Sequence, residues 1–297
     1  MIINAENLAA VRTGFSTAYA TGLGRAESQY ARITTTIPSS TKEQKYGWLG
    51  KFPRVRKWLG GRVVQNMSQG DYAIKEEKWE LTIGVDRDDI ETDNIGIYAP
   101  MFEEIGQSAG DAWDELIWPM LAAGFTTPCY DGQNYFDTDH LVLDEAGDTI
   151  SVANTDGGAG TPWFLLDVSR PLKPMILQKR KDFKFVSKDK ETDDNVFDLN
   201  EYVYGADARA NAGYGFWQIA WGSRQTLNEA NYEIGRAAMT GMKGDYGKPL
   251  GIKPNLLVVP PSLEGAGRRL VQSRIVDGVE TNIWAGSAEL LVASWLA

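Results

Sequence analysis

The chain has 297 residues, of which 43% are hydrophobic and 24% are charged, and its formal net charge is −10. This composition is typical of a globular protein with about two packed regions, and it excludes wholesale disorder. The chain lacks the ~20-residue apolar run that a membrane-spanning helix needs, and its first residues do not resemble a signal peptide. We therefore expect no membrane association, and a chain that stays in the cytoplasm where it is made.

The counts of reactive residues are low. The single cysteine, Cys129, excludes an internal disulfide, and the single histidine, His140, removes most metal and acid–base sites. The acidic balance argues against a protein that binds nucleic acid through phosphate contacts, because these need clustered Lys and Arg. It is compatible with a container for DNA, whose inner wall needs no adhesion.

The first 45 residues are small and polar with few large apolar side chains. We expect an arm with one short helix around 8–19, ordered mainly by packing on other parts of the structure.

Residues 46–95 alternate aromatic residues, glycines and charges. Strand-like stretches at 62–67 and 78–85 flank a turn-rich link at 68–72, which predicts a long hairpin. Such a hairpin buries too little apolar surface to be stable alone, so we expect residues 50–80 to serve assembly more than subunit folding.

A long amphipathic helix is predicted between Ile97 and Phe125, where apolar residues recur at spacings of three and four. Asn94 or Pro100 can start it and Gly124 can end it. A helix over 98–123 would be about 39 Å long, with a possible bend at Pro119. This helix would be a structural spine.

The remaining residues, 127–297, indicate mixed α and β structure. The pattern predicts a loop at 154–162, strands at 163–168, 175–178, 256–259 and 290–292, and a helix beginning at Ser262. The charge-dense run 179–194 is typical of a solvated turn. A helix over 227–240 is predicted from a capping-box pair, Thr226 and Glu229, and from Gly241 after it.

One segment collects several reactive side chains: residues 129–140 contain the only cysteine, the only histidine and three carboxylates. A Cys–His nucleophile pair or a metal site is conceivable there. The sequence identifies neither a third orienting group nor further nitrogen ligands. We therefore expect a polar loop with a turn at Asp131–Gly132 and with Tyr135 and Phe136 packed inward, and no catalytic, cofactor-binding or metal-binding residues.

Several blocks, in the same order along nearly the whole chain, resemble the major head subunits of Mu-like phages. They are YGWLGKFP at 46–53, RDD at 87–89, DNIGIYAP at 93–100, DELI at 114–117, GF at 124–125, PCYDGQN at 128–134, AGYGFWQ at 212–218 and LGIKP at 250–254. The resemblance implies an α+β chain with the Hong Kong 97 phage-type capsid fold, which has an N-terminal arm, an extended hairpin loop, a peripheral domain with a long spine helix, and an axial domain. It implies no catalytic residues.

The expected division of the chain follows from that fold. It is an arm at 1–45, the extended loop and its root at 46–95, the spine helix of the peripheral domain at 96–126, a mainly axial domain with peripheral strands at 127–265, and a C-terminal helix and closing strand at 266–297.

The resemblance also implies the setting in which the protein works. Hexamers and pentamers would form an icosahedral head shell around double-stranded DNA without sequence-specific binding, and the shell would be assembled in the cytoplasm of the bacterial host. A maturation protease and a portal protein are implied partners. A separate scaffold is expected, because no long helical scaffolding segment fits before Tyr46.

Two alternative functions are a tail or baseplate component, or an enzyme built around residues 129–140. Electron microscopy of the purified protein would distinguish them, because a capsid protein forms shells, a tail component forms tubes and an enzyme stays monomeric.

Charge is distributed unevenly between two neighbouring segments. Residues 42–62 carry seven basic residues and one acidic residue, a net charge of +6, whereas residues 76–115 carry thirteen acidic and two basic residues, a net charge of −11. Complementary patches that repeat around a closed shell can set register between subunits. The residues expected at contacts between subunits are Trp48, Lys51, Arg54, Arg56, Lys57, Trp58, Asp86, Asp88 and Asp89.

Overall fold

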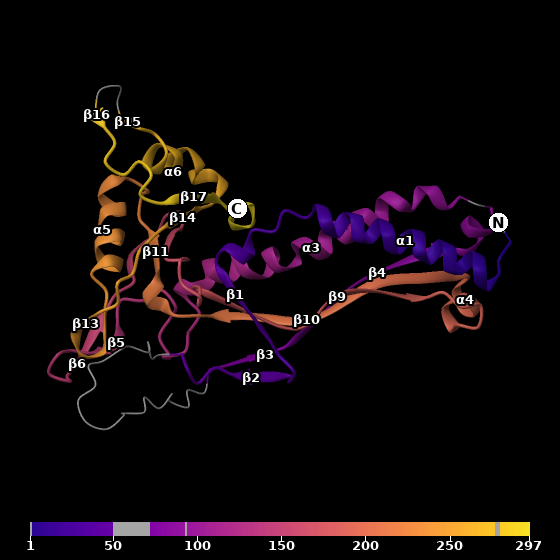
Figure 1. Cartoon of the computed structure of the whole chain (residues 1–297), viewed down its shortest axis with the longest axis horizontal. Helices are drawn as coiled ribbons and strands as arrows, with labels where there is room; N and C mark the ends of the chain where they lie inside the picture. Colours follow the sequence, from indigo (N-terminus) through magenta and orange to yellow (C-terminus); the bar gives the residue numbers. More distant parts are fainter. Residues whose placement is uncertain (1, 50–71, 93, 277–279) are drawn as a thin grey trace.

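The computed structural model describes residues 2–49, 72–92, 94–276 and 280–297. The molecule is elongated, with a compact lobe at one end and a long, thin layer of helices and strands that extends from it (Figure 1). We call these two regions the lobe and the long layer.

A four-stranded sheet forms the base of the long layer. Its order is β1 (Thr34–Pro38), β9 (Met175–Lys188), β10 (Glu201–Tyr214) and β4 (Glu77–Asp86). Strands β9 and β10 have 14 residues each and pair antiparallel, β4 pairs antiparallel with β10, and β1 runs parallel to β9. At ~3.3 Å per residue, a strand of this length reaches about 46 Å, which gives the layer its length.

Two helices that run in the same direction, α1 (Ala5–Arg25) and α3 (Ala99–Ala122), cover one face of this sheet (Figure 1). Helix α3 confirms the predicted spine: Pro100 lies in its first turn, Pro119 lies within it, and a 3₁₀ turn at Ala123–Phe125 follows it.

Helix α1 is longer than the short helix that the sequence predicted, and it packs directly on α3. The contact is close because glycines lie at the crossing points. A methyl group at Gly22 would overlap the carbonyl oxygen of Glu103, and one at Gly106 would overlap the carbonyl oxygen of Tyr19. The expectation that this segment is ordered by packing on other structure is confirmed.

The interpretation of residues 179–194 as a solvated turn is wrong for its first ten residues, because β9 continues to Lys188. Side chains of this half of β9 alternate between the helix-covered face, which Phe183 and Phe185 occupy, and the open face, where Lys184 and Val186 lie. A strand with one face open to water tolerates a high charge density. Strand β10, its partner, was not assigned from the sequence.

The lobe is built on a five-stranded sheet with helices beside it. The strand order is β17 (Glu289–Val292), β14 (Leu256–Val259), β8 (Trp163–Leu166), β11 (Ala220–Arg224) and β7 (Thr155–Gly158). The predicted strands at 256–259 and 290–292 are confirmed, whereas the predicted loop at 154–162 contains the short strand β7.

Helices α5 (Glu229–Thr240) and α6 (Glu264–Val271) lie beside this sheet. Helix α5 is capped by Asn228, whose side chain accepts a hydrogen bond from the Asn231 amide, so the proposed Thr226–Glu229 capping box is wrong. Gly241 follows α5 as predicted.

Short elements complete the chain. They are β2 (Glu43–Lys45), β3 (Ala73–Lys75), α2 (Arg87–Glu91), β5 (His140–Leu143), β6 (Thr149–Val152), α4 (Asp194–Leu199), β12 (Lys243–Gly244), β13 (Lys248–Pro249), β15 (Ile275–Val276), β16 (Glu280–Thr281), and 3₁₀ turns at Tyr30–Arg32, Ile95–Ile97, Trp217–Ile219, Asp245–Gly247, Pro261–Leu263 and Ser294–Leu296. Strands β2 and β3 pair antiparallel on either side of residues 50–71. The predicted strand at 62–67 and nearly all of the link at 68–72 lie outside the described residues, and β4 confirms the predicted strand at 78–85.

Helix α3 contributes to several apolar cores along its length. Its C-terminal half inserts Ile117, Trp118 and Leu121 into the large core of the lobe. Its N-terminal half contributes Phe102 to a smaller core that α1, β4 and β10 complete. None of the helices in the described ranges is both long enough and apolar enough to cross a bilayer.

Candidate functional sites: a buried polar cluster and an acidic tip

The segment between α3 and β5 folds as the sequence predicted. The amide of Gly132, which has a φ of +89°, donates to the carbonyl oxygen of Cys129, and the Gln133 amide donates to Oδ1 of Asp131. Tyr135 and Phe136 are buried in the lobe. The segment is therefore a tight, ordered loop.

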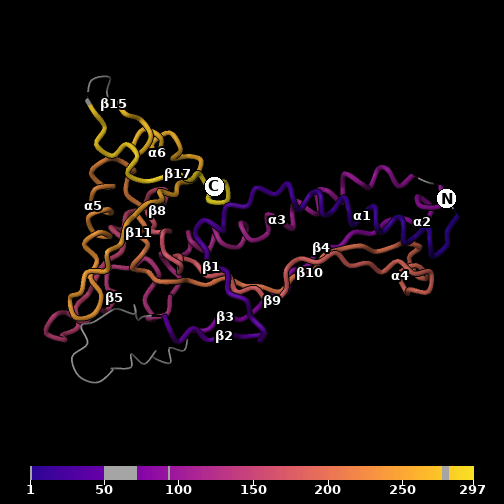
Figure 2. The backbone as a smooth tube through the Cα atoms, viewed as in Figure 1, coloured from indigo at the N-terminus to yellow at the C-terminus, as the bar shows by residue number. Residues whose placement is uncertain are grey.

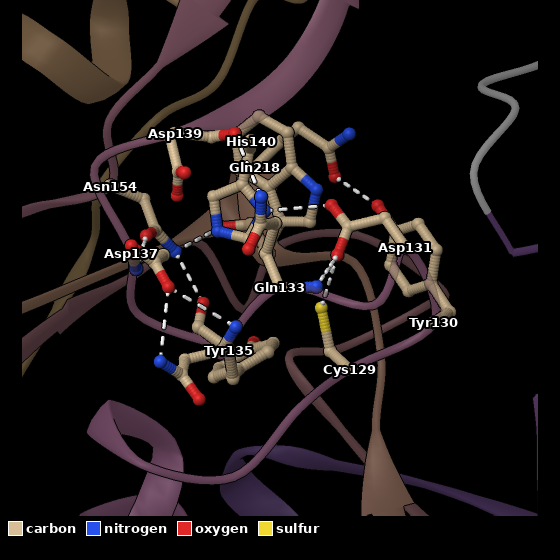
Figure 3. A network of polar contacts seen from close by, with 12 residues as sticks. Cys129, Tyr130, Asp131, Gln133, Tyr135, Asp137, Asp139, His140, Asn154 and Gln218 are labelled. Atoms are coloured by element: carbon tan, nitrogen blue, oxygen red, sulfur yellow. Dashed lines mark hydrogen bonds and ion pairs between the residues drawn. The ribbon is translucent and has the colours of Figure 1, made fainter.

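This loop brings Cys129, Asp131 and His140 together (Figure 3). One carboxylate oxygen of Asp131 accepts a hydrogen bond from Sγ of Cys129 at 3.1 Å, and the other lies 2.7 Å from Nδ1 of His140. The expectation that no third group orients the Cys–His pair is therefore wrong. The signal was present in the sequence, because a turn at Asp131–Gly132 brings the chain back toward Cys129, but the approach of β5 depends on the tertiary fold.

The electrostatics of the cluster keep the thiol protonated. Burial, followed by the nearby charge of Asp131, raises the pKa of Cys129 well above its ordinary value. Burial also opposes ionisation of Asp131, but hydrogen bonds from His140 and Cys129 outweigh it and lower the pKa of that carboxyl. A nucleophilic cysteine needs its thiolate form, so the metal-free arrangement does not provide an activated nucleophile.

Residues on other elements fix the cluster in the lobe. The His140 ring stacks on Trp217 with 4.0 Å between the ring centroids, and Tyr130 donates a hydrogen bond to Gln218. The fully buried Asn154 donates to the carbonyl oxygen of Tyr135 and accepts from the Asp137 amide. These partners lie far along the chain, and for that reason sequence reasoning missed them.

The residues expected at contacts between subunits fall into three groups. Lys51, Arg54, Arg56, Lys57 and Trp58 lie outside the described residues. Trp48 is half-buried and packs edge-on against Tyr46 and Phe216 of its own chain.

The three aspartates of the prediction lie together at the start of α2, at the end of the long layer remote from the lobe (Figure 2). Asp86 caps α2 by accepting from the Asp88 amide. Asp89 accepts hydrogen bonds from the Tyr98 hydroxyl and from Asn94, which lower the pKa of its carboxyl. Asp88 is exposed and has one long contact, 3.4 Å from Nδ2 of Asn200. Asp88 is therefore the aspartate with the smallest role inside the subunit.

Sequence reasoning missed that α4 lies beside α2 at this end of the molecule. The Arg87 amide donates to the carbonyl oxygen of Asn200, which connects the two segments. Together residues 86–92 and 191–200, which we call the acidic tip, carry eight acidic residues and one basic residue, Arg87. Two apolar side chains of α4, Phe197 and Leu199, are 89% and 67% exposed there. An exposed aromatic side chain among charges is typical of a contact surface.

Not all of the negative charge counted over 76–115 is available at the surface. The buried Glu76 carboxylate lies 2.8 Å from Arg180. Asp114 is 1% exposed and accepts hydrogen bonds from the Gln29 and Tyr30 amides and from the Trp118 indole. These two acidic residues stabilise the subunit itself and are not available to a neighbour.

An elongated subunit with a thin layer, a compact lobe and an exposed acidic tip is typical of proteins that tile a phage shell. The comparisons with known proteins define the family. The profile of the family "Mu-like prophage major head subunit gpT" matches residues 8–296. The chain is 43% identical to the "Major capsid protein" of Escherichia phage Mu over all of both chains, and 41% identical to the "Mu-like prophage FluMu major head subunit" of Haemophilus influenzae over 91% of each.

The solved structures agree with this family. The subunit in the procapsid of bacteriophage JBD30 superposes with a TM-score of 0.88 at 42% identity, covering 99% of this chain and 100% of the other. The chain belongs to the family of Mu-like major head subunits and has the Hong Kong 97 phage-type capsid fold. It is a major capsid protein, located in the capsid of the phage particle.

Proposed function

We propose that the subunit forms hexamers and pentamers of a closed icosahedral shell, and that the acidic tip of one subunit receives the basic segment 51–62 of a neighbour. The lobe then corresponds to the axial domain and the long layer to the peripheral domain. The layer also contains β1 from the predicted arm and β4 from the predicted loop root. The observation that supports the contact is the acidic tip, where eight acidic residues surround two exposed apolar side chains.

A weak contact between two subunits can direct assembly when it is repeated at every subunit of the shell. A single exposed ion pair contributes about 0–1 kcal/mol. In a shell the same pair recurs at every subunit, so complementary charges suppress wrong contacts and set register. The exposed Phe197 and Leu199 add apolar area that only a neighbour can bury.

Charge reversal tests this contact. Changing Arg54, Arg56 and Lys57 to Glu should leave a folded subunit that no longer assembles, and adding Asp88→Lys with Asp198→Lys should partly restore shells. Asp88 and Asp198 are exposed, and neither caps a helix as Asp86 does. Asp86 and Asp89 are left unchanged because both hold α2 in place.

A matched control separates this contact from net charge. The pair Asp148→Lys and Glu233→Lys alters two exposed acidic residues of the lobe by the same amount. This pair should not restore shells to the Arg54, Arg56 and Lys57 variant. Equal rescue by both pairs, measured by electron microscopy and sedimentation, would contradict the proposed contact.

We propose that residues 50–71 act in assembly rather than in folding. The rest of the predicted assembly segment, residues 73–80, belongs to the subunit's own fold, because β3 and β4 pair with other strands of the subunit and Ile74 is buried in the lobe.

The strands on either side of residues 50–71, at 43–45 and 73–76, are anchored to the subunit. Strand β2 pairs with β3, the Asn211 side chain donates to the carbonyl oxygen of Lys75, and Arg180 pairs with the buried Glu76. Deleting residues 64–70 spares these strands. The deletion should give a soluble, folded subunit without regular shells, and normal particles would refute the assignment.

We further propose a separate scaffold, a maturation protease and a portal protein as assembly partners, and enclosed double-stranded DNA as the content. The net charge of −10 supports a shell that encloses DNA without gripping it. Purified subunits should show no retention on duplex DNA at low salt. We propose no enzymatic role, because the Cys129 thiol is buried and its pKa is raised.

A further inference from the structure

Three side chains of the lobe carry the donor atoms that a thiophilic metal ion prefers. Sγ of Cys129, a carboxylate oxygen of Asp131 and Nδ1 of His140 all lie within 4.8 Å of one another. Within the described residues this is the one group of three or more such side chains that could hold an ion. Thiolate, imidazole and carboxylate are the ligands of zinc in proteins.

We propose that Cys129, Asp131 and His140 form a zinc-binding site that locks the loop between α3 and β5. Each side chain supplies one ligand, which leaves a fourth tetrahedral position for water. The thiol proton is released to solvent as the ion binds.

The spacing of the donors requires a local adjustment. In a tetrahedral zinc site with bonds of about 2.0–2.3 Å, the donor atoms lie about 3.3–3.6 Å apart. Here Oδ1 of Asp131 is 3.1 Å from the sulfur and Oδ2 is 2.7 Å from Nδ1, so the two contacts use different oxygens of the carboxylate. An ion bound by one of these oxygens would draw the sulfur and a ring nitrogen of His140, which lie within 4.8 Å of each other, toward a common centre.

The donors are held in place before any ion binds. Cys129 is 5% exposed, and its amide donates to the carbonyl oxygen of Gln133. His140 is fully buried and stacked on Trp217, while the Asp131 side chain is 22% exposed, which provides access for an ion. A site on rigid elements loses little freedom on binding.

The alternative is that the three side chains form only a hydrogen-bonded tie, and Cys129→Ser separates the two cases. The serine hydroxyl can still donate to Asp131, so the tie remains, but a soft metal ligand is lost. His140→Gln likewise retains a donor. Asp148→Asn, which removes an exposed carboxylate elsewhere in the lobe, is the matched control.

The experiment uses full-length protein purified without chelators, followed by metal analysis and by titration of the metal-free protein with Zn²⁺ and with Co²⁺. We expect about one zinc ion per chain, a rise in Tm of several degrees on adding Zn²⁺, and a thiolate-to-cobalt charge-transfer band. Cys129→Ser and His140→Gln should each weaken zinc binding roughly tenfold or more and lose the Tm rise, and Asp148→Asn should match the unmodified protein.

Two results would overturn the proposal. One is an unmodified protein that binds no zinc and shows no cobalt–thiolate band, a measurement that does not depend on any variant folding. The other is equal zinc binding by the unmodified protein and by Cys129→Ser, which would place the ion elsewhere.

Discussion

The lobe and the long layer differ in how many faces of their sheets are buried. In the lobe, strand β14 and strand β8 are buried along their whole length, with residues from the sheet, α3 and α5 closing around them. In the long layer, the helices cover one face of the sheet, and Val186 on the other face is 44% exposed. The comparison shows that strands β8 and β14 of the lobe are fully buried, whereas the sheet of the long layer keeps one face open.

Both regions pack large aromatic side chains, but they differ in how closely their helices approach. In the lobe, Phe164 packs against Phe125 and Phe136. In the layer, Phe15 stacks on Phe102, and in addition α1 approaches α3 closely because glycines lie at Gly22 and Gly106. Close backbone approach therefore adds to side-chain packing in the layer.

The largest expected loss of stability comes from removing a large side chain from the core of the lobe. Phe164 is fully buried on β8, so Phe164→Ala should lower the free energy of unfolding by about 3–5 kcal/mol. The same change at the exposed Phe197 is the matched control and should alter stability by less than about 0.5 kcal/mol while reducing shell yield. Urea denaturation and particle counts would measure both. Similar losses of stability in Phe164→Ala and Phe197→Ala would contradict the prediction that the lobe depends on its buried core and the acidic tip does not.

Gly106→Ala should disrupt the layer and leave the lobe folded. The added methyl group overlaps the carbonyl oxygen of Tyr19, which should cost about 3 kcal/mol locally and displace α1. Hydrogen exchange should accelerate over residues 5–25 but not over β14.

Gly14→Ala on α1, the helix that packs against Gly106, is the control for this change. A methyl group there meets no atom within 4 Å, so it should stabilise α1 by about 0.4–1 kcal/mol. Equal exchange rates in the two variants would mean that close helix contact does not hold the layer.

Asp114→Asn should loosen the junction between the two regions. The Gln29 and Tyr30 amides and the Trp118 indole would keep one acceptor oxygen but lose its negative charge. The second oxygen would become an NH2 donor beside the Gln29 amide, at an expected cost of about 1–3 kcal/mol. The exposed neighbour Glu115 provides the control Glu115→Gln, for which we expect no measurable change. Thermal unfolding of both variants tests this, and an unchanged Tm for Asp114→Asn would contradict it.

The smallest expected effect is a loss of local stability in the acidic tip at low pH. Hydrogen bonds from Tyr98 and Asn94 lower the pKa of Asp89, so its contribution to stability is present above the ordinary aspartate pKa of about 3.9 and is lost as the pH falls through the folded value. Hydrogen exchange over residues 87–92 and 94–98 should therefore accelerate below about pH 4. Asp89→Asn should remove this pH dependence, and Asp148→Asn should retain it.

Local patterns predicted the elements whose periodicity is clear. The spacing of apolar residues located α3, and short apolar runs located β14 and β17. The charged half of β9 was misassigned because charge density indicates exposure to water rather than secondary structure, and here only one face of the strand is exposed.

Contacts between distant segments could not be predicted from one sequence. The acidic tip depends on α2 and α4 meeting across about a hundred residues, and the polar cluster is held by Trp217 and Gln218, which lie far along the chain from it. Gly22 and Gly106 are ordinary helix residues in the sequence, and their role depends on the packing of α1 on α3.

The most direct test of the proposed contact is an electron cryomicroscopy reconstruction of the assembled shell at a resolution that shows side chains. We predict that Asp88, Phe197 and Asp198 of each acidic tip lie against a neighbouring subunit, with Arg54, Arg56 or Lys57 of that neighbour within ion-pair distance. A shell in which those basic side chains face solvent, with no acidic residue of any other subunit beside them, would contradict it.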